Sequence, residues 1–212
     1  MSRKTMERMV RRKFVTGAAR RLFASKGIEN TRMEDIAAAV DYTRRTIYSY
    51  FKSRYEICLL VFVEDLAARW EEQKRAVALV ESGLEKITVW GHTLFTYAQE
   101  NPHYMRLEAY WDYTRLDPKQ LSRESFLSFE NLNNGLADSL REMFRLGMQD
   151  GSLRPGLHVD MCISQYLYSL RSVIYRALSP GYSFAVFEPG EYVENYLDLF
   201  SRGICSMEGA GK

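Results

Sequence analysis

The chain has 212 residues, of which 46% are hydrophobic, and its 29 basic and 27 acidic side chains give a formal net charge of +2. This length and composition allow a sizeable buried core. The chain has three cysteines and no Cys-x-x-Cys pair, so we expect no disulfide framework and no zinc site. The apolar run at residues 57–63 is too short to span a bilayer. We therefore expect a cytoplasmic protein with no membrane partner.

The charge is unevenly distributed along the chain. Residues 1–54, which we call the basic head, contain 14 Lys and Arg against 5 Asp and Glu, a net charge of +9. The remaining residues carry 15 basic and 22 acidic side chains, a net charge of −7. A basic segment joined to an acidic body indicates a polyanionic partner for that segment alone.

The first predicted helix carries two neighbouring apolar rows and ends at a glycine. Apolar residues recur at i, i+4 and i+8 as Phe14, Ala18 and Leu22, and as Val15, Ala19 and Phe23. Gly27 between Lys26 and Ile28 is a typical helix stop. The first ten residues are polar, and we expect a loose arm there, either frayed or able to reach a minor groove.

Two short helices joined by a turn are predicted between Thr31 and Lys52. Thr31 and Glu34 have capping-box spacing, which predicts a helix start just after Thr31. An apolar stripe follows at residues 33, 36, 37 and 40. Asp41 interrupts the stripe and tolerates unusual backbone angles, so we expect the turn there.

The second short helix is predicted to begin after Thr43, whose hydroxyl can cap it. Ile47 and Phe51 lie four residues apart and are expected to face inward. The opposite side is then basic and polar, carrying Arg44, Arg45, Thr46 and Tyr48. Arginine donates paired hydrogen bonds to guanine, and hydroxyls bond phosphates. The alternative is an ordinary amphipathic helix pair with a solvated basic side, but the charge asymmetry favours nucleic acid.

One set of residue types at fixed offsets supports a family resemblance. The set is Ala18-Ala19, Leu22-Phe23, Gly27, Thr31, Asp35-Ile36-Ala37, Thr43, Thr46-Ile47-Tyr48, Tyr50-Phe51-Lys52-Ser53 and Ile57. With it, the segment from about residue 13 to 60 resembles the DNA-binding domain of the TetR (tetracycline repressor) family. The resemblance implies an all-α fold. It divides the chain into an N-terminal three-helix helix-turn-helix domain, 1–54, and a C-terminal helical effector-binding and dimerisation domain, 55–212.

The resemblance also implies a function and a set of DNA contacts. A regulator of this kind, most simply a repressor, releases a near-palindromic double-stranded operator when a small effector binds. The implied contacts to base edges are Thr43, Arg44, Arg45, Thr46 and Tyr48. The implied contacts to phosphates and the DNA backbone are Thr31, Arg32, Tyr50, Lys52 and Arg54. Three positions depart from the family pattern. Asp41 stands where the family usually has Gly, Arg45 where it often has a small residue, and Tyr55 where an acidic residue is common. Arg45 predicts a different base preference.

The body is predicted to be helical throughout. The expected helices cover residues 53–80, 84–100, 103–113, 122–149, 159–178 and 191–205, separated by Gly and Pro breaks. A short β-pattern at 184–187 is the one exception, and the tail 208–212 is expected to be disordered.

The last two predicted helices have broad apolar faces, which indicate either core packing or an oligomer interface. In the family that the chain resembles, these helices pair with their copies across a two-fold axis. We therefore expect a homodimer through Leu167, Leu170, Ile174, Tyr196, Leu197 and Phe200.

Residues 90–129 are rich in aromatic side chains interspersed with acids. Aromatic rings and carboxylates attract cations, so we expect an effector with an aromatic ring or a positive charge. The candidate pocket residues are Trp90, Phe95, Tyr104, Glu108, Trp111, Asp112, Phe126 and Phe129. The alternative is ordinary core packing by aromatic residues.

An enzyme is the competing class of function. The three histidines lack metal-ligand spacing, and no nucleophile elbow, phosphate loop or dinucleotide motif occurs, so we expect no cofactor, no metal and no catalytic residue. Glu108 and Asp112, four residues apart, would be the acid–base pair of a small all-helical enzyme or binding protein. A membrane-surface protein is disfavoured, because the apolar side of the first helix suits a globular core.

Overall fold

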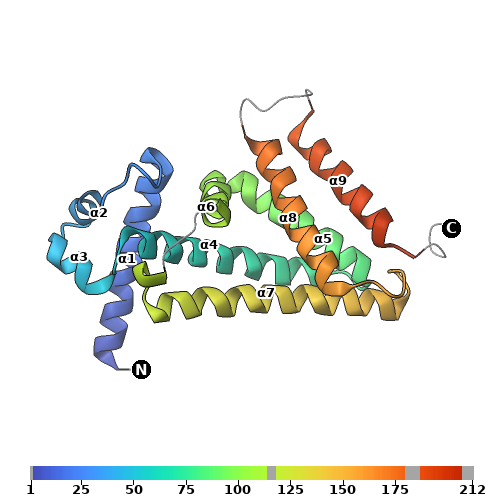
Figure 1. Ribbon diagram of the computed structural model, residues 1–212, viewed down its shortest axis with the longest axis horizontal. Coiled ribbons are helices and arrows are strands. Elements are labelled where there is room, and N and C mark those ends of the chain that lie inside the picture. Colours follow the sequence, from blue (N-terminus) through green and yellow to red (C-terminus); the bar gives the residue numbers. More distant parts are fainter. Residues whose placement is uncertain (1, 114–117, 180–186, 207–212) are drawn as a thin grey trace. The chain divides into compact units, whose positions relative to one another are not determined.

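The computed structural model describes residues 2–113, 118–179 and 187–206, without the side chains of residues 4, 112, 113 and 118 (Figure 1). These ranges contain nine α-helices, one 3₁₀ helix and no strand. The helices are α1 (Arg3–Lys26), α2 (Met33–Ala39), α3 (Arg44–Tyr50), α4 (Arg54–Val77), α5 (Gly83–Glu100), α6 (Pro102–Tyr113), the 3₁₀ helix η1 (Pro118–Gln120), α7 (Arg123–Asp150), α8 (Val159–Leu178) and α9 (Pro189–Ile204). The predicted all-α fold is confirmed. In the described segments, no helix is both long enough and apolar enough to cross a membrane.

The chain forms two compact units. Unit 1 comprises Met1–Ala67 and Arg106–Leu132, and unit 2 comprises Ala68–Met105 and Asn133–Lys212. Three helices, α4, α6 and α7, therefore contribute residues to both units. The division into domains 1–54 and 55–212 remains a prediction. The β-pattern at 184–186 and the tail 208–212 lie outside the described residues.

The expected N-terminal arm is wrong, because α1 begins at Arg3. The Ser2 hydroxyl accepts a hydrogen bond from the Thr5 amide, and Arg3 pairs with Glu7 one turn later. A cap and an i,i+4 ion pair favour helix in a polar segment. At the other end the Gly27 amide bonds the Phe23 carbonyl at 3.0 Å with a φ of 82°, as the glycine stop predicts.

The core of unit 1 is built from the inward faces of its first helices. Four residues of the predicted α1 rows, Val15, Ala18, Ala19 and Phe23, are buried. Phe14 was expected with them, but it is 56% exposed. In α2 and α3 the buried apolar residues are Met33, Ile36, Ala37 and Ile47.

Unit 2 contains the long apolar helices. In α5, Ile87, Trp90 and Leu94 are buried, and α8 and α9 pack side by side (Figure 1). The predicted bounds of α8 are confirmed, and the other body helices begin and end within a few residues of prediction. Gly83 opens α5 against Gly147 of α7, so close that a Cβ on Gly83 would overlap the Gly147 backbone. Glycine is required at that approach.

Candidate nucleic-acid interface and ligand cavity

The turn between α2 and α3 is set by Asp41, which has a φ of 55°. This left-handed conformation suits Asp because its short polar side chain tolerates it. The Tyr42 amide bonds the Ala37 carbonyl at 2.9 Å, which closes the turn. The predicted turn is confirmed, but α2 begins at Met33 with Arg32 as N-cap. Asp35, not Glu34, accepts the Arg32 amide at 2.9 Å, and that bond lowers the pKa of the Asp35 carboxyl.

Helix α3 begins after Thr43, as expected. The Thr43 hydroxyl oxygen accepts the Thr46 amide at 3.1 Å, which satisfies one of the free N–H groups of the first turn. Ile47 and Phe51 are buried at 0% and 1% exposure, so they hold the helix against the rest of unit 1. The opposite side of α3 faces solvent. We call its side chains the recognition surface: Thr43, Arg44, Arg45, Thr46 and Tyr48.

The two arginines of the recognition surface differ in their contacts. Arg44 pairs with Glu34 at 3.1 Å and lies over the Tyr48 ring, but its side chain is 67% exposed. An exposed ion pair of this kind is weak and exchanges readily for another anion. Arg45 is exposed and makes no hydrogen bond or ion pair to the described part of the chain. Its guanidinium is therefore available to a polyanion.

Three predicted DNA contacts have other partners in the structure. Thr31 is fully buried, and its hydroxyl donates to the Gly27 carbonyl at 2.8 Å. Arg54 donates to the backbone carbonyls of Glu29 and Thr31 and pairs with the Glu29 carboxylate at 3.0 Å. The Lys52 ammonium donates to the Leu121 carbonyl at 3.0 Å. Arg32 and Tyr50 remain at least partly exposed, and the Tyr50 hydroxyl accepts from Arg11 at 3.2 Å.

The segment after α3 is hydrogen-bonded to the start of α7. Ser53 donates to the Gln120 carbonyl at 2.8 Å, and the buried Glu56 carboxylate accepts from the Lys52 amide at 2.6 Å and the Ser125 hydroxyl at 2.7 Å. Burial alone would raise the pKa of Glu56, but hydrogen bonds led by that from Ser122 lower it overall. Unit 1 thus links the end of the recognition helix to α7 through buried polar contacts.

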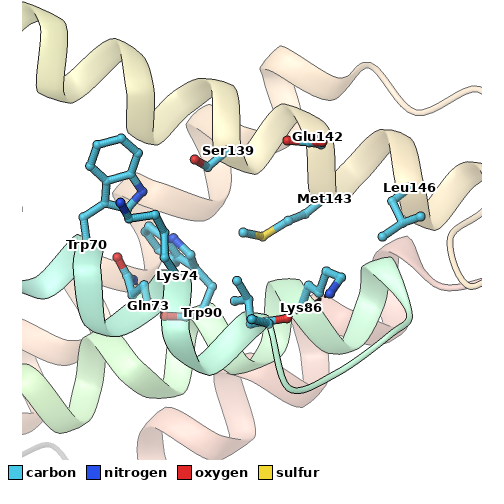
Figure 2. A pocket seen from close by; sticks show the side chains of 11 residues that line it. Trp70, Gln73, Lys74, Lys86, Trp90, Ser139, Glu142, Met143 and Leu146 are labelled. Atoms are coloured by element: carbon cyan, nitrogen blue, oxygen red, sulfur yellow. Dashed lines mark hydrogen bonds between the residues drawn. The ribbon is translucent and has the colours of Figure 1, made fainter.

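A cavity of about 340 Å³ lies within unit 2, between α4, α5 and α7. Its volume is at the lower end of the range for small-molecule sites, which is about 300–1,000 Å³. Figure 2 shows Trp70, Gln73 and Lys74 of α4 on one side and Ser139, Glu142 and Met143 of α7 on the other. Trp90 of α5 lies behind the α4 side chains and completes the wall.

Of the eight predicted pocket residues, one lines this cavity, namely Trp90. Phe95 and Tyr104 are buried elsewhere in unit 2, whereas Glu108, Trp111, Asp112, Phe126 and Phe129 belong to unit 1. The Asp112 side chain lies outside the described part, and Phe126 is 39% exposed. Trp70, Gln73 and Met143 also line the cavity and are not among the predicted residues. Trp70, Gln73, Lys74 and Val77 do recur at i, i+3, i+4 and i+7, but a polar row with that spacing is typical of a solvated face.

The residues expected at the dimer interface divide into two groups. Leu170, Ile174 and Leu197 are at most 2% exposed within a single chain, so they form its own core. Leu167, Tyr196 and Phe200 are partly exposed. Larger exposed apolar side chains occur on the same helices at seven-residue spacing: Met161, Tyr168 and Tyr175 on α8, and Tyr192 and Leu199 on α9. Among the described residues, no cluster of three or more His, Cys, Asp or Glu could hold a metal.

A short capped helix with an exposed arginine-rich surface, packed behind a tight turn on a second short helix, defines a helix-turn-helix DNA-binding protein. Residues 15–61 match the sequence profile of the family described as bacterial regulatory proteins, tetR family. The predicted resemblance of residues 13–60 to the DNA-binding domain of the TetR family is confirmed.

The relatives match along most of the chain. It is 24% identical over 200 residues to the HTH-type transcriptional repressor KstR2 of Rhodococcus jostii, covering 92% of both sequences. The structure of the ketosteroid transcriptional regulator KstR2 of Mycobacterium tuberculosis is similar with a TM-score of 0.68 and 19% identity, covering 92% of this chain and 95% of that one. FadR of Bacillus subtilis, solved in complex with stearoyl-CoA, gives a TM-score of 0.69 at 18% identity over 90% and 97% of the two chains. At these identities the structural likenesses establish the fold.

Proposed function

We propose that this protein is a homodimeric repressor that binds a near-palindromic operator and releases it when a small effector fills the cavity of unit 2. The recognition surface is the observation that carries the proposal. It places two arginines, one of them without any partner in the described residues, on the exposed side of a helix fixed by Ile47 and Phe51. Because an operator lies on the bacterial chromosome, the protein would act in the cytoplasm.

The proposed DNA contacts are the side chains of the predicted set that are exposed and not held by buried polar contacts within unit 1. Arg44 and Arg45 are assigned to base edges, because arginine pairs with guanine in the major groove. Thr46 and Tyr48 lie beside them, and Arg32, Thr43 and Tyr50 are assigned to the DNA backbone. Thr31, Lys52 and Arg54 are not proposed as contacts, because their polar groups bond within unit 1. They position the recognition surface instead.

The proposed dimer uses the exposed apolar residues of α8 and α9. Residues that repeat every seven positions along two packed helices suit a four-helix interface with a second copy. Tyr168 is 65% exposed and Leu199 is 61% exposed, so both are available to a partner. Two copies would place their recognition surfaces in successive major grooves, about 34–36 Å apart.

The proposed coupling runs through helices that contribute to both units. The second half of α4 lines the cavity, and its first residues follow directly after α3. Likewise Ser139, Met143 and Leu146 of α7 line the cavity, whereas Ser125 near the start of α7 donates to Glu56. A ligand that changes the packing of α4 against α7 at the cavity would also act on the other end of each helix, next to the recognition surface. Effector and operator then oppose each other's binding, typically by about 1–3 kcal/mol.

We favour a regulator over an enzyme. The relatives are regulators, and nothing in the described part of the chain favours acid–base chemistry at Glu108 and Asp112.

The proposed repressor function is tested by selecting DNA duplexes from a random pool with the purified full-length protein, followed by a salt titration. The variant with Arg44→Ala and Arg45→Ala is the control. Enrichment of an inverted repeat by the wild type alone, with a steep salt dependence, is the expected result. A folded dimer that enriches no sequence would refute the proposal.

A further inference from the structure

Arg69 on α4 is a buried cation without an acidic partner among the described side chains. Its side chain is 1% exposed, and its Cζ lies 5.4 Å from the Trp90 ring and 5.5 Å from the Tyr104 ring. Its Nε and Nη1 are buried and make no hydrogen bond. Stacking on two rings stabilises the charge but leaves these N–H groups unsatisfied. A buried charge normally requires both a counter-charge and hydrogen bonds.

The same region of unit 2 contains further unsatisfied polar atoms on residues that line the cavity, whereas Arg69 itself is not one of the lining residues. The Nε1 groups of Trp70 and Trp90 are buried donors without an acceptor, and Gln73 Oε1 is a buried acceptor without a donor. Gln73 is held in place because its Nε2 donates to the Trp90 carbonyl at 3.0 Å. Arg69 precedes Gln73 by one helical turn, and the Trp90 ring that stacks on Arg69 is part of the cavity wall.

Unsatisfied donors outnumber unsatisfied acceptors around this site. Arg69 contributes two and the indoles of Trp70 and Trp90 one each, against the single oxygen of Gln73. Lys74 and Lys86 also line the cavity, but Lys74 pairs with Glu71 at 2.6 Å and Lys86 donates to the carbonyls of Val77 and Val80. Glu142 is the one acid of the lining and is exposed. A ligand that satisfies such a site supplies acceptors and a negative charge.

The rest of the lining is suited to hydrocarbon. Val77 and Leu146 lie on opposite helices, and Met143 extends from α7 toward the α4 side chains (Figure 2). Methionine adapts to ligands of irregular shape. The cavity thus combines an apolar body with a donor-rich wall at Trp70 and Trp90.

We propose that the effector is an amphipathic organic anion, with its hydrocarbon part in the cavity and its acidic group bonded by the indole N–H groups of Trp70 and Trp90. The buried charge of Arg69, stacked on the Trp90 ring, attracts that acidic group. This inference rests on the proposed function, since it names the ligand class of the same site. It replaces the expectation of a cationic effector, because a second cation would be repelled by Arg69. A carboxylate and a phosphate ester share the required chemistry.

The test uses four ten-carbon probes that differ in their head groups: decanoate, decyl phosphate, decanol and decyltrimethylammonium. Each is titrated calorimetrically, below its micelle concentration, into the full-length protein without DNA. We expect at least one anion to bind tenfold or more tightly than decanol, and the ammonium not to bind. The anion that binds distinguishes a carboxylate site from a phosphate site. Binding by no probe, or equal affinity for decanol and both anions, would overturn the inference.

Variants identify the site. Arg69→Met should weaken anion binding at least tenfold and change decanol binding less than twofold, whereas Arg75→Met, an exposed position on the same helix, should change neither. Trp70→Phe removes one indole donor and keeps an aromatic ring, so it should weaken anion binding more than decanol binding even if Arg69→Met does not fold. Anion affinity unchanged in both cavity variants contradicts the assignment. Operator release is measured separately by fluorescence anisotropy, so anion binding without release refutes the repressor coupling but not the ligand class.

Discussion

The recognition surface of unit 1 and the cavity of unit 2 present their polar groups in opposite ways. On α3, Arg44 and Arg45 are exposed, and the residues that position them are buried. In unit 2, Arg69, Trp70 and Gln73 keep unsatisfied polar atoms inside the protein. An exposed cation can contact a large polyanion such as DNA. A buried cation can act only on a ligand that is small enough to enter the cavity beside it. In our proposal, one chain would recognise anions of two sizes, because it buries one set of donors and exposes the other.

The largest effect is expected from disrupting the dimer, which would separate the two recognition surfaces. The variant with Tyr168→Glu and Leu199→Glu should be monomeric by light scattering and lose about 10²–10⁴-fold in operator affinity, because each half-site then binds alone. Anion binding in the cavity should change little. Gln165→Glu, an exposed change on α8 outside the seven-residue row, is the control. An intact dimer in the double variant would place the interface elsewhere.

Arg45→Ala tests whether the exposed arginine contacts bases. It should cost about 1–3 kcal/mol at the selected operator and relax the preference at one base pair, while anion binding stays unchanged. Anisotropy titrations with operators substituted at each position measure both effects. If affinity for every sequence falls equally, Arg45 is a phosphate contact and the base assignment is wrong.

Glu56→Gln tests the buried contacts that join α3 to α7. The carboxyl has a lowered pKa in the folded protein, so its contribution to stability is present above the unfolded-state pKa and is lost as pH falls through the folded-state pKa. At pH 7 the variant should be less stable by about 1–3 kcal/mol in urea unfolding. The difference from wild type should shrink as the pH falls below the ordinary range for glutamate, near pH 4. A difference independent of pH would mean that the ionised carboxylate is not what stabilises this joint.

The smallest effect is expected at the turn before α3. Asp41→Gly should raise stability by roughly 0.5–1 kcal/mol, because glycine adopts a φ of 55° without the steric cost that a Cβ brings. Asp41→Ala should lower it, since alanine has neither the freedom of glycine nor a polar group that bonds locally. Urea unfolding of the three proteins gives the order, and a less stable Gly variant would show that the Asp41 side chain stabilises the turn.

The recognition surface could be predicted from the sequence, whereas the cavity could not. Helix α3 could be recognised because its cap, inward residues and arginines lie within nine consecutive residues, so spacing alone defines the surface. The roles of Thr31, Lys52 and Arg54 could not be recognised from the sequence, because their partners depend on how the chain folds back. Lys52, for instance, donates to the Leu121 carbonyl. The cavity was missed for a related reason. Trp70 and Met143 are far apart in sequence, and Arg69 resembles any helical arginine until its burial is known.

The most direct test of the division between the two regions is hydrogen–deuterium exchange of the full-length dimer, alone, with its selected operator, and with a bound anionic probe. Operator should slow exchange in peptides covering residues 43–50, and the probe should slow exchange in peptides covering residues 69–77 and 139–146. Operator binding that leaves residues 43–50 unchanged would contradict the central claim that the exposed side of α3 is the DNA-binding surface.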